Sequence, residues 1–271
     1  SSLEELVRCL ENSARAKLAT GNVKESTAHL TESLELSRAY YEKRPTHQAG
    51  GLVGESLSSL AKLEEARGNT GKARAYAEEN LLHWRDMASR WREIPSVHQG
   101  LLAALEVTST LRRAEGATKE ALPLVREAVE RQRKHVAKNE VDGTRLRNLA
   151  VVLERLGSAE AEQGAADEAQ RHYEESAKIR RRFLAELPDD RGSQLDLAVI
   201  LDRLGDLADT RREHALAHKS HEEAVGLLRA LAVGLAGKGM RGNLAIAARK
   251  LGGHCLHDQD LEEARKLYLE C

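Results

Sequence analysis

The fold is decided by residues 149–181, which read LAVVLERLGSAEAEQGAADEAQRHYEESAKIRR. Apolar and small residues recur at intervals of three or four on both sides of Gly164: Leu149, Leu153 and Leu156 before it, and Ala169, Tyr173 and Ala177 after it. This spacing places each set on one face of an α-helix. Glycine between the two sets permits a tight turn, so the segment predicts a helix hairpin.

The same pattern recurs along the whole chain. Aligning it on Gly164 gives six anchor positions, spaced by 47, 48, 48, 48 and 47 residues: Gly21, Gly68, Gly116, Gly164, Arg212 and Gln259. The residue five places after the anchor is always small: Ser26, Ala73, Ala121, Ala169, Ala217 and Ala264. A constant period of this length predicts stacked hairpins in one array over residues 1–271. The expected repeats are approximately 3–48, 51–97, 98–143, 144–191, 192–239 and 240–271, the last incomplete.

Two charged columns accompany the anchors. Eleven places after it, every unit has glutamate: Glu32, Glu79, Glu127, Glu175, Glu223 and Glu270. Seventeen places after it, five units have arginine: Arg38, Arg85, Arg133, Arg181 and Arg229. Residues six apart do not face each other on one helix. Because the columns occur once per unit, we interpret them as contacts between stacked units and not as a binding site.

The fourth unit resembles the tetratricopeptide repeat. The matching residues stand at that family's spacing: Leu153, Leu156, Gly157, Gly164, Ala169, Tyr173 and Ser176. The resemblance implies an all-α, right-handed α-solenoid of antiparallel helix hairpins. The period exceeds the family's about 34 residues, and arginine replaces the family's closing proline in five units, so we expect lengthened helices. Trp84 and Trp91 are expected to pack on the inner face of the second helix of the second repeat. Long-repeat arrays of this style resemble those of kinesin light chains and bacterial signalling proteins.

The resemblance also implies a concave partner-binding groove. Transferring the family's groove positions gives the candidates Glu106, Glu154, Ser158, Glu162, Asp202, Asp206, Asp209 and Arg249. These residues predict a groove with an acidic centre, which suits a protein or peptide partner with a basic segment. The alternative is that they form a solvated helix face, as charged residues usually do.

Histidines cluster late in the chain, and a metal site is one interpretation of them. The candidate ligands are His214, His218, His254 and His257. His214 and His218 are four residues apart, which places both rings on one helix face, as a transition-metal site requires. His221 stands where other units have an aromatic core residue, so packed neutral histidine is the competing interpretation. We therefore predict no metal and no cofactor.

Composition excludes several functional classes. With 42 Lys+Arg against 43 Asp+Glu, the net charge is −1, and there is no basic excess for nucleic acid or a membrane surface. The sequence contains neither a phosphate-binding glycine loop nor a nucleophile–base motif, so we predict no enzyme activity. Cys9, Cys255 and Cys271 lack the spacing of a disulfide framework. We expect reduced thiols and a cytoplasmic location.

These observations predict a protein–protein interaction scaffold. The alternative is a regulatory or sensory module of a larger signalling enzyme, such as a bacterial Ser/Thr kinase. Neither methionine, Met87 nor Met240, begins the chain, and the sixth unit stops at Cys271. We therefore expect the chain to be part of a longer array, whose uncapped terminal repeats could self-associate.

Overall fold

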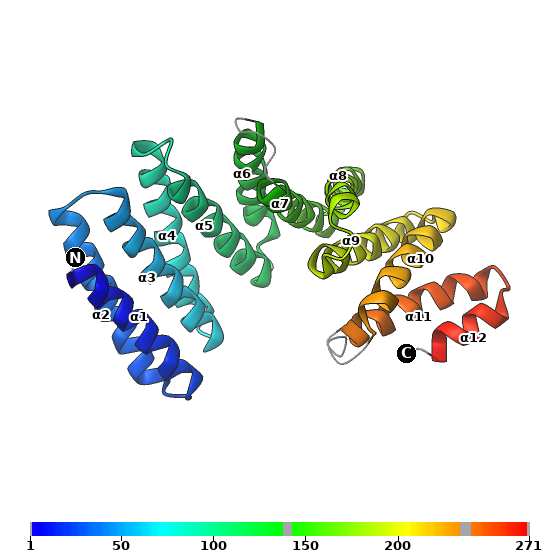
Figure 1. Cartoon of the computed structure of the whole chain (residues 1–271), viewed down its shortest axis with the longest axis horizontal. Coiled ribbons are helices and arrows are strands. Elements are labelled where there is room, and N and C mark those ends of the chain that lie inside the picture. Colours follow the sequence, from blue (N-terminus) through cyan, green and yellow to red (C-terminus); the bar gives the residue numbers. More distant parts are fainter. Residues whose placement is uncertain (1, 138–142, 234–239, 270–271) are drawn as a thin grey trace. The chain divides into compact units, whose positions relative to one another are not determined.

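The computed structural model describes residues 2–137, 143–233 and 240–269, so Glu270 and Cys271 lie outside the described residues. The elements of these ranges are twelve α-helices: α1 (Ser2–Ala19), α2 (Val23–Lys43), α3 (His47–Ala66), α4 (Thr70–Arg90), α5 (Pro95–Ala114), α6 (Thr118–Ala137), α7 (Gly143–Glu162), α8 (Ala166–Glu186), α9 (Arg191–Thr210), α10 (His214–Leu231), α11 (Arg241–His257) and α12 (Leu261–Leu269). Consecutive helices form hairpins (Figure 1). None of the described helices combines the length and apolar character that a membrane crossing requires.

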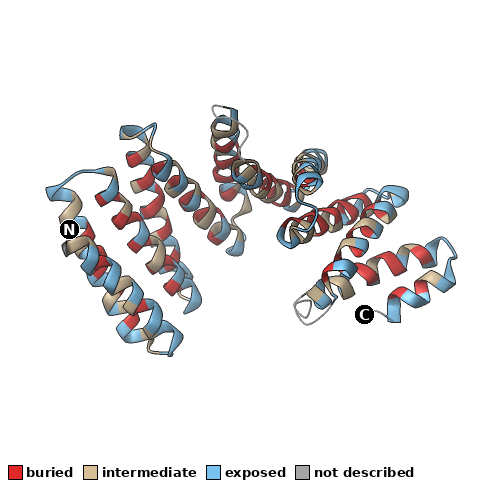
Figure 2. Ribbon diagram, viewed as in Figure 1, coloured by how far each residue is buried: buried red, intermediate tan, exposed pale blue. Residues whose placement is uncertain are grey.

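The chain divides into two compact units, Ser1–Ala128 and Val129–Cys271, with the division inside α6. In the first unit, α2 packs on α3 and α4 on α5, while α3 contacts both α1 and α5. In the second, each helix from α7 to α12 packs on the next. Buried residues line the helix faces that meet within each unit (Figure 2). The predicted all-α class and the stacking of hairpins are thus confirmed within each unit.

The anchor positions form six equivalent turns. The residue after each anchor donates its backbone N–H to the carbonyl five residues before it, at 2.8–2.9 Å: Asn22 to Lys17, Asn69 to Glu64, Ala117 to Arg112, Ala165 to Glu160, Glu213 to Ala208 and Asp260 to Cys255. This is the hydrogen bond of a Schellman C-cap, which requires a left-handed residue at the anchor. Arg212 (φ 59°) and Gln259 (φ 64°) adopt that conformation like the four glycines. The predicted alignment of these two residues with the glycines is therefore confirmed.

Arginine at this position is strained, since a Cβ atom disfavours positive φ. We expect Arg212→Gly to raise the free energy of unfolding by about 0.5–1 kcal/mol, the relief of strain exceeding the added flexibility of the unfolded chain. Urea unfolding followed by circular dichroism measures the change. Gly164→Ala is the control with the opposite sign, because it places a Cβ at φ 77°. An unchanged or lower midpoint for Arg212→Gly would contradict the interpretation.

The glutamates and arginines of the two charged columns pair between neighbouring repeats. The arginine of one B helix, the second helix of a hairpin, reaches the glutamate of the next B helix in four cases: Arg38 to Glu79, Arg85 to Glu127, Arg133 to Glu175 and Arg181 to Glu223. Arg229 contacts Glu263 at 4.0 Å. The predicted stacking role is confirmed. These pairs are half-exposed, so each contributes little to stability by itself.

The glycine seven places before the anchor leaves room for a ring of the B helix to pack against the first helix of the hairpin in three repeats. A Cβ atom at Gly157 would lie 2.8 Å from the Tyr173 ring, and one at Gly205 would lie 2.4 Å from His221. At Gly252 it would lie 3.1 Å from the Tyr268 ring. His221 is fully buried in this ring position, which confirms the prediction of a packed core histidine.

Candidate functional site

Seven of the eight predicted groove residues lie on A helices, the first helices of hairpins, of the second unit. We call this set the A-helix surface: Glu154, Ser158 and Glu162 on α7, Asp202, Asp206 and Asp209 on α9, and Arg249 on α11. Glu162, Asp206 and Arg249 are exposed, whereas Ser158 is buried. The eighth residue, Glu106, is half-buried on α5 in the first unit. Their role in partner binding stays a prediction.

Lys250 of α11 contacts two carboxylates of this surface. Its Nζ atom lies 2.7 Å from a carboxylate oxygen of Asp202 and 2.7 Å from one of Asp206. Burial alone would lower the pKa of Lys250, but hydrogen bonds to the two carboxylates outweigh burial and raise it. Burial alone would raise the pKa of Asp202, but His221 and Lys250 lower it. Lys250 and Asp202 therefore form an ion pair, and Asp206 places a second carboxylate beside the same ammonium group.

Glu154 on α7 is also paired with cations. It lies 3.4 Å from Arg203 of α9 and 3.7 Å from the buried Arg180 of α8. Burial raises the pKa of Glu154, with the two guanidinium groups opposing the rise. Ser158 is equally engaged, since its hydroxyl donates to the Glu154 carbonyl and accepts from Arg203 and from Tyr173. Ser158 is thus part of the scaffold's internal bonding.

These cations were not predicted from the sequence, although they stand in one column of the repeat alignment. The residue nine places before the anchor is a cation in repeats four, five and six: Arg155, Arg203 and Lys250. Arg203 contacts Glu154, and Lys250 contacts Asp202, so each cation reaches the acidic position ten places before the preceding anchor. The A-helix surface is therefore less acidic than the sequence predicts, because cations from the following repeat neutralise some of its carboxylates.

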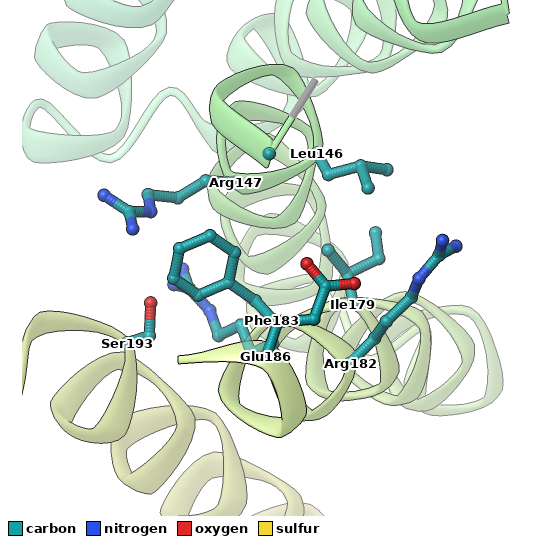
Figure 3. A pocket seen from close by; sticks show the side chains of 9 residues that line it. Leu146, Arg147, Ile179, Arg182, Phe183, Glu186 and Ser193 are labelled. Atoms are coloured by element: carbon teal, nitrogen blue, oxygen red, sulfur yellow. The ribbon is translucent and has the colours of Figure 1, made fainter. Parts of the chain in front are cut away.

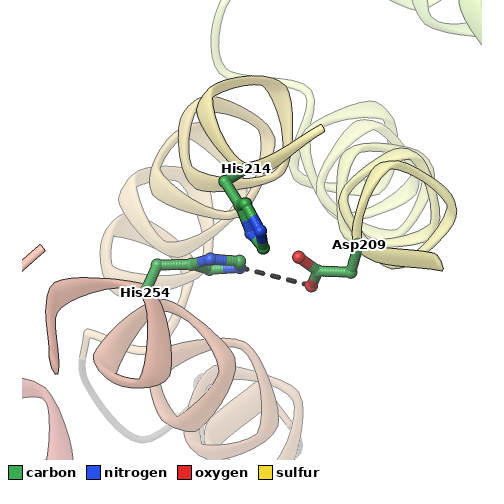
Figure 4. A group of neighbouring side chains, drawn as sticks. All are labelled: Asp209, His214 and His254. Atoms are coloured by element: carbon green, nitrogen blue, oxygen red, sulfur yellow. Dashed lines mark ion pairs between the residues drawn. The ribbon is translucent and has the colours of Figure 1, made fainter. Parts of the chain in front are cut away.

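Asp209, near the end of α9, lies among imidazoles instead. Its Oδ2 atom is 3.3 Å from Nε2 of His254 and 3.5 Å from Nε2 of His221. His214 of α10 and His254 of α11 both point toward the Asp209 carboxylate (Figure 4). Burial lowers the pKa of His254, as do His221 and His218, while Asp209 opposes the shift.

The other predicted histidine ligands lie around this group. The ring of His257 stacks on His214 with centroids 4.8 Å apart, and the ring of His218 lies 6.0 Å from that of His254. His218 and His257 also contact Asp258, each through Nδ1 at 3.3 Å. The structure thus brings together the four histidines that the sequence analysis grouped. It adds Asp209 and His221, which the spacing of histidines alone could not identify as their neighbours.

A small pocket in the second unit was not predicted. Its volume is about 140 Å³, and its lining includes residues of α7, α8 and the start of α9. The Phe183 ring forms one wall, and the guanidinium of Arg147 stacks on it at 4.4 Å (Figure 3). Arg180 and Arg182 also border the pocket.

No protein-family model matches the sequence, and no curated protein matches it. Solved structures with a similar fold include BtubC from P. vanneervenii, at 18% identity and a TM-score of 0.68, covering 90% of this chain and 87% of that one. A signal transduction ATPase with a tetratricopeptide repeat sensor from Pyrococcus horikoshii has 15% identity and a TM-score of 0.64, covering 97% of this chain and 35% of that one. A putative kinesin light chain from Podosopora anserina has 18% identity and a TM-score of 0.54, covering 80% and 92%. These similarities show a tetratricopeptide-like fold.

Proposed function

We propose that this chain, with its tetratricopeptide-like fold, is a protein-interaction scaffold that binds a basic partner segment on the A-helix surface of its second unit. Asp202, Asp206 and Asp209 lie on one face of α9 because their spacing of four and three residues matches the helical turn. A lysine or arginine of the partner would pair with these carboxylates. Such pairs contribute more to association rate and specificity than to affinity.

The observation that carries the proposal is the contact between Lys250 and two carboxylates. Asp202 and Asp206 hold one ammonium group at 2.7 Å from each, so this part of α9 already has the geometry of a cation receptor. Asp206 remains half-exposed while paired. A basic partner residue would therefore compete with Lys250 or bind beside it. Removing a carboxylate and removing Lys250 should then change the partner affinity in opposite directions.

The test uses peptides selected from a random display library against the full chain, with fluorescence polarisation as the readout. We expect the selected peptides to be rich in lysine and arginine. Asp206→Lys should weaken binding about five- to tenfold at low salt, and Lys250→Met should strengthen it by removing the competing ammonium. Added salt should reduce the difference between the variants.

The matched control is Glu174→Lys, which makes the same charge change at an exposed position of α8. A net-charge effect alone would weaken binding equally in Glu174→Lys and Asp206→Lys. Equal effects, or selected peptides without basic residues, would contradict the proposal. Circular dichroism of each variant confirms that the helices are retained.

A further inference from the structure

We infer that Asp209, His214 and His254 form a binding site for a divalent transition metal of the zinc class. One ligand atom from each residue lies within 4.8 Å of the others. The Nε2 atom of His254 is already 3.3 Å from Oδ2 of Asp209, a separation that two ligands of one tetrahedral zinc ion can adopt at bond lengths of about 2.0–2.2 Å. His214 is exposed at the first position of α10, and its ring points toward the same carboxylate (Figure 4).

The neighbouring charges distinguish Asp209 from the other two carboxylates of α9, Asp202 and Asp206. Asp202, Asp206 and His221 also have one ligand atom each within 4.8 Å of the others, but Lys250 already supplies a cation there at 2.7 Å from both carboxylates. Asp209 has imidazole neighbours, His221 and His254, in place of an ammonium. A metal ion would give this carboxylate the positive charge that Lys250 gives the other two.

The hydrogen-bonding geometry of the buried His221 is a second, independent observation. His221 is fully buried, and neither of its ring nitrogens makes a well-aligned hydrogen bond to the described residues. Its Nδ1 atom lies 3.3 Å from Asp202 without the alignment of a hydrogen bond, and its Nε2 atom lies 3.5 Å from Oδ2 of Asp209. Buried polar atoms are normally satisfied by protein or ordered water. A hydrated metal ion on Asp209 would place a water ligand where His221 could bond to it.

The donor set selects the class of metal. Two imidazoles and one carboxylate suit zinc and its neighbours, whereas magnesium and calcium prefer oxygen ligands alone. Three protein ligands leave a fourth position for water. The ion would connect the end of α9, the start of α10 and the end of α11, so it would hold the fifth hairpin to the sixth.

Isothermal titration of zinc chloride into the metal-free full chain tests the inference. The protein must carry no histidine tag, because a tag would bind the same ions. We expect one zinc ion per chain, and at least about tenfold weaker binding for His214→Ala and for Asp209→Asn. Zinc should also raise the melting temperature of the parent, since it binds only the folded arrangement.

Three controls separate this site from other ligands. His47→Ala removes a histidine that also begins a helix, but in the first unit. Cys9→Ser removes an exposed thiol, and Asp206→Asn alters the neighbouring cluster. Each should retain the parent affinity within about twofold, far below the loss expected from removing a ligand.

Zinc binding that is unchanged in both His214→Ala and Asp209→Asn would overturn the inference, as would the absence of saturable binding. Because His214 is exposed, its replacement leaves the core intact, and circular dichroism verifies this. Cobalt provides a second readout, since a four-coordinate site gives intense visible absorption that the hydrated ion lacks. Loss of that absorption in His214→Ala would support the assignment.

Discussion

Gly54→Ala is expected to lower the free energy of unfolding by about 2–3 kcal/mol, the upper part of the range for overpacking a core. Trp84 of α4 is buried, and its indole lies against Gly54 of α3 and Gly100 of α5. A Cβ atom at Gly54 would stand 2.4 Å from Nε1 of Trp84, and one at Gly100 would stand 2.4 Å from its Cη2 atom. The indole is held from both sides, so it cannot move away from the added methyl group.

The sign of this effect is diagnostic, because alanine normally stabilises a helix by about 1 kcal/mol relative to glycine. Gly51 on the same helix has open space around its Cα, so Gly51→Ala is a control that should stabilise the protein. The chain's only tryptophans, Trp84 and Trp91, both lie in the first unit. Tryptophan fluorescence during urea unfolding therefore reports on the unit that is mutated.

A double variant tests the mechanism. Trp84→Leu alone should destabilise the unit, but Gly54→Ala should cost much less when combined with it, because the clashing indole is gone. The remaining Trp91 provides the fluorescence signal. Additive costs would show that Gly54 acts through some other contact, and stabilisation by Gly54→Ala alone would contradict the packing argument.

Arg180→Ala is expected to destabilise the second unit by about 3 kcal/mol, whereas Arg181→Ala should cost less than about 1 kcal/mol. The two arginines are adjacent on α8, and each binds a carboxylate. Arg180 is 2% exposed and lies 2.5 Å from Asp196 and 3.7 Å from the half-buried Glu154. Arg181 is 50% exposed and pairs with Glu223 on the surface. Removing Arg180 leaves Glu154 with one guanidinium neighbour fewer in a desolvated position.

Urea unfolding followed by circular dichroism compares the two variants. Arg180→Met is the informative control, because it keeps most of the buried volume while removing the charge. Since Nε of Arg180 has no hydrogen-bond partner among the described residues, we expect methionine to recover part of the loss. Equal costs for Arg180→Ala and Arg181→Ala would show that burial does not distinguish the two ion pairs.

The helices and their turns were predictable because they depend on short-range spacing. The left-handed turn at Arg212 and Gln259 could be predicted only from alignment with Gly164 and its equivalents, since neither residue favours positive φ by itself. Burial of Trp84 followed from its phase on the helix. Its contact with two glycines did not, because Gly54 and Gly100 lie on different helices.

The candidate site was only partly predictable. Its carboxylates came from transferred repeat positions, and the sequence analysis treated them as an acidic surface. The partners Lys250 and Arg203 belong to the following unit, one column away, so a comparison within a single repeat could not reveal them. The histidines after Arg212 and those before Gln259 were expected to meet through helix stacking, but Asp209 was not recognised as their neighbour.

Repetition made the hairpin readable from residues alone, because six copies of one local pattern report the same backbone conformation. The charge and the side-chain partners of the surface were decided by packing between successive repeats. Residues 45 positions apart, such as Asp209 and His254, meet only after α9, α10 and α11 have stacked. A charge or a ligand set depends on which long side chains reach across that stack, and local spacing carries no information about that distance.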